Sequence, residues 1–283
     1  MTMEVRAGTS GYSYKEWRGR FYPPDVPQDE WLGYYAERLP TVEINNTFYR
    51  MPRTHVVQTW RDTVPGTFRF VIKASRRITH QKRLHDVSEP LGFLLNRAEI
   101  LGEKLGALLF QLPPYMPADL ERLESFQADL PVDFPAAFEF RHRSWDDPAV
   151  DESLARYGHA RVVSHETGAP PARLTDGPLL YLRLRAPGYT ATALGRWHEK
   201  VVASGAERAY VFFKHEDGAA GPQMAARFLA LESKPAPRRA AKRGAATAPE
   251  ATSGTDEPAR PAADRPRPRA ATRRSGPGSR KRR

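Results

Sequence analysis

Short apolar segments alternate with helix-like segments along residues 1–233, and this alternation constrains the fold more than any other feature. Eight segments have the composition and spacing expected of strands: Glu4–Gly8, Thr41–Asn45, Phe68–Lys73, Ala107–Gln111, Ala137–Arg141, Ala160–Ser164, Leu179–Arg183 and Tyr210–Lys214. Strands separated by helices pair in parallel, and eight of them can close into a barrel. We therefore predict an α/β domain over residues 1–233 with a (β/α)8 TIM-type barrel.

Most intervals between these strands carry apolar residues at helical spacing. Ser88 is expected to cap one helix, and Asp147 followed by Pro148 is expected to open another. The interval between Ser164 and Leu179 has no helical period, so we predict that a loop replaces the helix after strand six. A doubly wound open sheet is the alternative fold. It is disfavoured because no G-x-G-x-x-G turn follows the first strand.

Residues 234–283 have a different composition. They hold 15 Lys and Arg against 4 Asp and Glu, which accounts for the whole net charge of +11, and they contain no aromatic residue and no Ile, Leu, Val or Met. Such a segment cannot bury enough apolar surface to offset the entropy of ordering, so we predict a disordered basic tail. It is either a solvated extension or an electrostatic tether for nucleic acid or another polyanion.

Several classes of protein are excluded or disfavoured by composition. The absence of cysteine excludes disulfides, zinc–thiolate sites and a cysteine nucleophile. No apolar run approaches the length of a membrane span, and residues 1–11 lack the pattern of a signal peptide. We therefore expect a cytoplasmic protein without a membrane partner, and the sequence leaves the oligomeric state open.

Polar side chains gather where the predicted strands end. In a TIM barrel the carboxyl ends of the strands meet at one mouth, which is where such barrels place their chemistry. Residues two apart share a strand face, so Glu43 should lie beside Asn45, and Glu139 beside Arg141. Glu139 and Glu43 are the predicted catalytic acid or base. The predicted substrate-binding residues are Arg141, Lys73, Arg183, Asn45, Thr9, Ser10, Gln111, His80 and Lys214.

These residues support two interpretations. Arginine suits phosphate and carboxylate, so the mouth is expected to serve an enzyme, for example a hydrolase or isomerase, that acts on a small anionic substrate of the phosphate-ester or sugar-like kind. The other interpretation is a purely structural ion-pair network that plugs the barrel, because a glutamate inside an apolar strand is costly unless paired.

Other functions stay open at this stage. The barrel could instead bind nucleic acid or act as a scaffold, with the tail as tether, or be a metal-dependent hydrolase or nuclease. A divalent cation would need ligands such as His80, His142, His165 and His215, but no metal-binding spacing joins them, so we predict no metal residues and leave the cofactor open. Four aromatic residues follow the first strand: Tyr12, Tyr14, Trp17 and Tyr22. They either form the floor of a pocket for a sugar or a base, or they cover the barrel.

Several motifs occur in a fixed order: Gly8-Thr9-Ser10-Gly11-Tyr12, Glu43-Ile44-Asn45-Asn46-Thr47-Phe48-Tyr49, Gln111-Leu112-Pro113-Pro114 and Glu139-Phe140-Arg141-His142-Arg143-Ser144-Trp145. Over residues 4–232 the chain resembles the YecE-like family of domains of unknown function. The resemblance implies a TIM-barrel fold and supplies no reaction. Many members end strand eight with an asparagine pair, where this chain has Lys214-His215-Glu216-Asp217, so a role for that strand end does not carry over.

Overall fold

The computed structural model describes residues 3–132, 134–166, 174, 177–214 and 217–232. The chain divides into two units, Met1–Ala236 and Pro237–Arg283. The predicted tail, residues 234–283, lies outside the described residues, and so do His215 and Glu216. The tail and the domain boundary at residue 233 therefore stay predictions.

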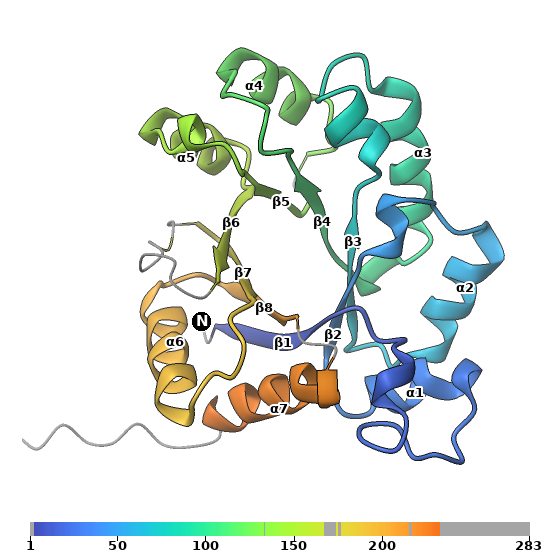
Figure 1. Ribbon diagram of the computed structural model, residues 1–283. Coiled ribbons are helices and arrows are strands. Elements are labelled where there is room, and N and C mark those ends of the chain that lie inside the picture. Colours follow the sequence, from blue (N-terminus) through green and yellow to red (C-terminus); the bar gives the residue numbers. More distant parts are fainter. Residues whose placement is uncertain (1–2, 133, 167–173, 175–176, 215–216, 233–283) are drawn as a thin grey trace, which may run out of the picture. The chain divides into compact units, whose positions relative to one another are not determined.

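Eight parallel strands form a closed barrel in sequence order, which confirms the predicted TIM-type fold (Figure 1). The barrel closes where the last strand pairs with the first, with Thr9 beside Phe213. The strands are β1 (Glu4–Ser10), β2 (Thr41–Ile44), β3 (Arg69–Lys73), β4 (Leu105–Gln111), β5 (Ala136–Glu139), β6 (Ala160–His165), β7 (Leu179–Leu184) and β8 (Arg208–Phe213).

Helices surround this ring of strands (Figure 1). They are α1 (Trp31–Ala36), α2 (Thr54–Thr63), α3 (Ser88–Glu99), α4 (Leu120–Ala128), α5 (Pro148–Arg156), α6 (Ala191–Ala203) and α7 (Ala220–Glu232). Short 3-10 turns lie at Lys15–Trp17, Gln28–Glu30, Asn46–Phe48, Gly102–Lys104, Arg143–Trp145 and Asp217–Ala219, and Arg77–Gln81 is a π-helical turn. Most of the predicted loop between β6 and β7 falls outside the described residues, and none of its described residues is helical.

The helix starts test two sequence predictions. Asp147 caps α5 as predicted, with its carboxylate accepting from the Ala149 amide at 2.9 Å. The prediction that Ser88 caps α3 is wrong, because Val87 occupies the cap position without a side-chain hydrogen bond. Val87 is buried and its carbonyl already accepts from the Leu91 amide at 2.8 Å, so Ser88 lies inside the first turn.

The aromatic residues after β1 largely cover the barrel. Trp17 and Tyr22 are buried, and the Tyr22 ring stacks on Trp31 of α1 with 4.4 Å between ring centroids. Tyr12 and Tyr14 are half-buried and line a small cavity of about 180 Å³. Trp17 and Tyr22 therefore cover the barrel, and a sugar or base pocket at Tyr12 and Tyr14 stays a prediction.

The inside of the barrel has an apolar layer. A buried cluster separate from the main core contains Val71, Ala107, Leu109, Ala137, Ala160, Val162, Leu179, Tyr181, Tyr210 and Phe212. These residues alternate along the strands with residues that pack under the helices, so they fill the barrel. β1 and β2 approach closely here: a Cβ at Gly8 would lie 2.0 Å from the Thr41 carbonyl oxygen, so the position accepts no side chain. The inward residues that come after this layer, toward the strand ends, are polar.

Candidate functional site

Arg183 of β7 lies between two glutamates from other strands. Its Nη1 donates to Glu139 Oε2 at 2.5 Å, and its Nη2 donates to Glu43 Oε1 at 2.6 Å. All three residues are at most 3% exposed. Period-two alternation turns all three toward the barrel interior, and Glu139 and Arg183 lie two residues after Ala137 and Tyr181 of the apolar layer. With Lys73, Arg141 and Arg185 they form what we call the charged cluster.

Glu43 is surrounded by hydrogen-bond donors. Besides Arg183 it accepts from the Tyr181 hydroxyl at 2.5 Å, the Ser10 hydroxyl at 2.8 Å and the Asn45 amide at 2.9 Å. Burial raises the pKa of Glu43, but the Arg183 charge and these three donors outweigh burial and leave the pKa below its ordinary value. The Glu43 carboxylate is therefore ionised at neutral pH.

Glu139 has mainly charged neighbours. It accepts from Gln111 Nε2 at 2.8 Å and from Arg141 Nε at 3.2 Å, and Arg185 Nη2 lies 3.9 Å away. Burial raises the pKa of Glu139. The charges of Arg183, and then of Arg185 and Arg141, lower this pKa by more than burial raises it, so that it falls to about 2. Both carboxylates are thus ionised, which favours a base or charge-stabilising role over proton donation.

Lys73 ends β3 and has no carboxylate partner among the described residues. Its Nζ donates to Gln111 Oε1 at 2.9 Å and lies 4.3 Å from the centre of the Phe48 ring. Burial and then Arg183 lower the pKa of Lys73 to about 8. His80 packs edge-on against the same Phe48 ring at 4.9 Å, and burial, followed by Lys73 and Arg141, lowers its pKa as well.

Two predicted substrate-binding residues lie apart from the charged cluster. Thr9 faces the helix layer, where its hydroxyl contacts the Tyr35 hydroxyl at 2.9 Å and donates to the Gly11 carbonyl at 2.6 Å. Lys214 is exposed and has no side-chain partner among the described residues. The structure brings the other predicted residues together at the mouth: Ser10, Glu43, Asn45, Lys73, His80, Gln111, Glu139, Arg141 and Arg183.

Tyr181 and Phe48 are site residues that the sequence analysis missed. Tyr181 could have been found, because it shares a strand face with Arg183 two residues on. Phe48 lies in a 3-10 turn after β2, where no strand periodicity applies, so no sequence signal marks it.

No group of three or more His, Asp or Glu residues among those described could hold a metal ion. His165 faces outward, away from the barrel interior, with its Nδ1 2.8 Å from the Tyr189 hydroxyl. His142 Nδ1 lies 2.8 Å from the Ser144 hydroxyl in an exposed turn. His142 and His165 therefore have different neighbours and do not face a common site.

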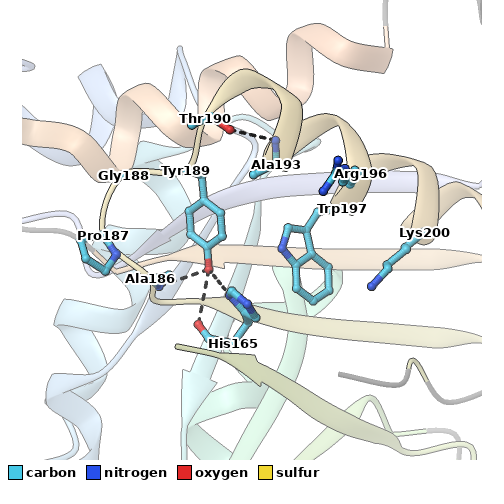
Figure 2. Close-up of a pocket in the computed structure, with 10 residues that line it drawn as sticks. All are labelled: His165, Ala186, Pro187, Gly188, Tyr189, Thr190, Ala193, Arg196, Trp197 and Lys200. Carbon is cyan, nitrogen blue, oxygen red and sulfur yellow. Dashed lines mark hydrogen bonds between the residues drawn. The ribbon is translucent and has the colours of Figure 1, made fainter. Parts of the chain in front are cut away.

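A cavity of about 450 Å³ lies between the end of β6 and α6, and no residue of the charged cluster lines it (Figure 2). It is bordered by His165 at the end of β6, by the loop around Tyr189 and by Trp197 of α6. Figure 2 shows the Tyr189 hydroxyl directed at His165, which holds the loop against the strand end. The smaller cavity lined by Tyr12 and Tyr14 reaches the cluster through Asn45, which bonds Glu43.

The fold and the site together define a parallel βα barrel with a buried charged cluster at its carboxyl-terminal mouth. A family model described as "Protein of unknown function DUF72" matches residues 6–248. The chain belongs to this family, in agreement with the YecE-like resemblance.

Two curated relatives match about half of this chain. UPF0759 protein YecE of Escherichia coli K12 is 32% identical over 135 residues, 47% of this chain and 50% of the relative. UPF0759 protein YunF of Bacillus subtilis is 28% identical over 158 residues, 53% of this chain and 56% of the relative. The matched region thus spans about half the length of each relative.

Solved structures of the family share the barrel. A DUF72 family protein from Thermotoga maritima has 27% identity and a TM-score of 0.68, covering 82% of this chain and all of that one. A second, from Enterococcus faecalis, has 20% identity and a TM-score of 0.67, covering 82% of this chain and 96% of that one, and shows the fold alone. None of the described helices is long and apolar enough to cross a membrane.

Proposed function

We propose that the protein is an enzyme that binds a small anionic substrate at the charged cluster. The observation that carries this proposal is an excess of positive charge. Two buried carboxylates face four cations, and Arg185 is also within 3.4 Å of Glu166, whose side chain is 64% exposed. Even with Glu166 counted, one positive charge lacks a counter-ion among the described residues. Buried charge is costly unless paired, so an anion would complete the cluster.

Arg141 is the cation best placed to bind that anion. Its Nε bonds Glu139, while its two terminal nitrogens have no partner in the described part of the chain. Its side chain is 36% exposed, against 3% for Arg183. The planar guanidinium presents two parallel donors, which suits phosphate and carboxylate groups.

A structural ion-pair plug explains less of this arrangement. It accounts for Arg183, whose two terminal nitrogens are both held by carboxylates. It does not account for the unused donors of Arg141, or for a buried Lys73 that pairs with an amide. In our proposal Arg183 holds the two carboxylates in place, Arg141 and Lys73 face the substrate, and Glu139 or Glu43 acts as base or stabilises developing positive charge.

Thermal unfolding of the full chain with added anions tests this function. Inorganic phosphate, sugar phosphates and small carboxylates are compared at one ionic strength, so that the basic tail is screened equally in every sample. An anion at about 100 times its Kd should stabilise the fold by roughly 2.7 kcal/mol.

Two variants separate the site from general charge effects. Arg141→Gln should lose the stabilisation, whereas Arg143→Gln, at an exposed turn two residues on, should keep it. The proposal fails if no anion stabilises the wild-type chain, or if the Arg141 variant responds as the wild type does.

Two further proposals rest on the sequence. Residues 234–283 would tether the barrel to polyanions, and the protein would act in the cytoplasm. Deleting the tail should then weaken polyanion binding and reduce its dependence on salt, while leaving the response to small anions unchanged.

A further inference from the structure

Gln111 separates the Lys73 amine from the nearest carboxylate. The Gln111 carbonyl oxygen accepts from Lys73 Nζ at 2.9 Å, and its amide nitrogen donates to Glu139 Oε2 at 2.8 Å. These two bonds fix the orientation of the amide. A lysine that served to neutralise Glu139 would contact the carboxylate directly. Here the amine has a neutral hydrogen-bond partner and keeps further donor positions for a ligand.

Burial and two arginines favour the uncharged amine of Lys73 and outweigh the opposite effect of Glu43 and Glu139. The side chain is 9% exposed and lies near the charges of Arg183 and Arg141. With a pKa of about 8, about a tenth of Lys73 is neutral at pH 7, roughly 300 times the neutral fraction of an ordinary lysine. A neutral amine is the nucleophile that carbonyl substrates require.

We propose that Lys73 forms an imine with the substrate, and that the substrate is therefore a small anion that carries an aldehyde or ketone group. This inference rests on the proposed function, because Arg141 must hold the anionic end. The lysine nitrogen bonds to the carbonyl carbon, and the carbonyl oxygen takes up the two amine protons and leaves as water. A C=N bond replaces the C=O bond, with no change of oxidation state.

The distance between the two ends of the substrate is limited by Glu139. Arg141 bonds one oxygen of this carboxylate, and Gln111, which holds the Lys73 amine, bonds the other. The anion site and the amine are thus on opposite sides of a single carboxylate. This spacing suits a short molecule such as a 2-oxo acid or a small carbonyl phosphate.

Reductive trapping tests the inference on the full chain. The protein is incubated with glyoxylate, an aldehyde that carries a carboxylate, and borohydride then reduces any C=N bond to a stable secondary amine. Peptide mass spectrometry locates the adduct. At pH 7 we expect Lys73 to be labelled at least tenfold more than any other lysine. The labelling rate should rise to half its maximum near pH 8.

The controls use matched variants and a matched probe. Lys73→Arg should reduce total labelling to the background of exposed lysines, whereas Lys200→Arg on α6 should leave Lys73 labelling unchanged. Glycolaldehyde, which lacks the anionic group, should label Lys73 much less than glyoxylate. Inorganic phosphate should protect Lys73 from glyoxylate.

The results distinguish this inference from the proposed function. If phosphate stabilises the fold through Arg141 but Lys73 is labelled no more than exposed lysines, the imine is wrong and anion binding stands. If neither effect occurs, both proposals fail. Equal labelling by glycolaldehyde and glyoxylate would overturn the anionic substrate class. The pH profile of the wild type gives an independent result if Lys73→Arg does not fold.

Discussion

The apolar layer inside the barrel and the charged cluster above it share β3, β5 and β7, on which they lie one inward position apart. β4 changes from Leu109 to Gln111, and β7 changes from Tyr181 to Arg183. On these two strands a step of two residues therefore leads from the packed interior to the polar mouth of the barrel. The apolar layer excludes water from below, which strengthens every electrostatic interaction in the cluster.

The two layers should differ in how they respond to change. The stability of the apolar layer comes from buried area and close packing, which do not depend on pH. The cluster balances a large desolvation cost against ion pairs, so its contribution depends on each partner and on protonation. This difference can be tested by variants in each layer and at their boundary.

The largest effect is expected from Arg183→Met. This change leaves Glu43 and Glu139 buried without their shared counter-ion and should lower the free energy of unfolding by about 3–5 kcal/mol. Urea unfolding at pH 7 measures it. Arg185→Met is the matched control and should cost less, since its contacts are 3.4 and 3.9 Å long and both carboxylates keep Arg183. Equal losses in the two variants would show that Arg183 does not hold the cluster.

Acid should weaken the cluster and spare the apolar layer. The folded pKa of Glu139, about 2, is below its ordinary value of 4.5, so its stabilisation is complete above pH 4.5 and disappears as the pH falls toward 2. That contribution is on the order of 3 kcal/mol. The stability difference between wild type and Glu139→Gln should therefore shrink over this range. Leu109→Ala should lower the free energy of unfolding by about 2–5 kcal/mol, and this loss should be the same at every pH in the range. If the difference in unfolding free energy between wild type and Glu139→Gln did not change with pH, the lowered pKa of Glu139 would be contradicted.

Much of this comparison could be predicted from the sequence. Period-two alternation and the rule that barrel chemistry lies at strand ends were enough to select Glu43, Lys73, Glu139 and Arg183. Thr9 and Ser10 were selected together, although adjacent strand residues face opposite sides, and the structure places Thr9 against Tyr35 in the helix layer.

Contacts across the barrel could not be predicted. The sequence does not say that Arg183 bridges both carboxylates or that Gln111 separates Lys73 from Glu139, because these residues come from different strands. The six-residue helix α1 is too short to show a 3.6-residue period, and Phe48 lies in a turn. What the sequence leaves out is thus the pairing within the site, which depends on how the barrel closes.

The smallest effect concerns Tyr181, which belongs to both layers. Its ring packs in the apolar layer against Phe212, while its hydroxyl donates to Glu43 at 2.5 Å. Tyr181→Phe keeps the ring and removes a hydrogen bond to a charged group, so we expect a loss of about 2 kcal/mol in urea unfolding. Because that bond lowers the pKa of Glu43, the loss should also shrink as Glu43 becomes protonated in acid.

Tyr210→Phe is the matched control for this boundary. Tyr210 lies in the same apolar layer and its ring stacks on Phe212, but its hydroxyl has no hydrogen-bond partner among the described residues. Its replacement should change the free energy of unfolding by less than about 0.5 kcal/mol. If both variants lower the free energy of unfolding by the same amount, the Tyr181 hydroxyl does not stabilise the Glu43 carboxylate, and Tyr181 belongs to the apolar layer alone. If Tyr181→Phe alone is costly and sensitive to acid, the apolar layer supplies one of the groups that keep Glu43 ionised.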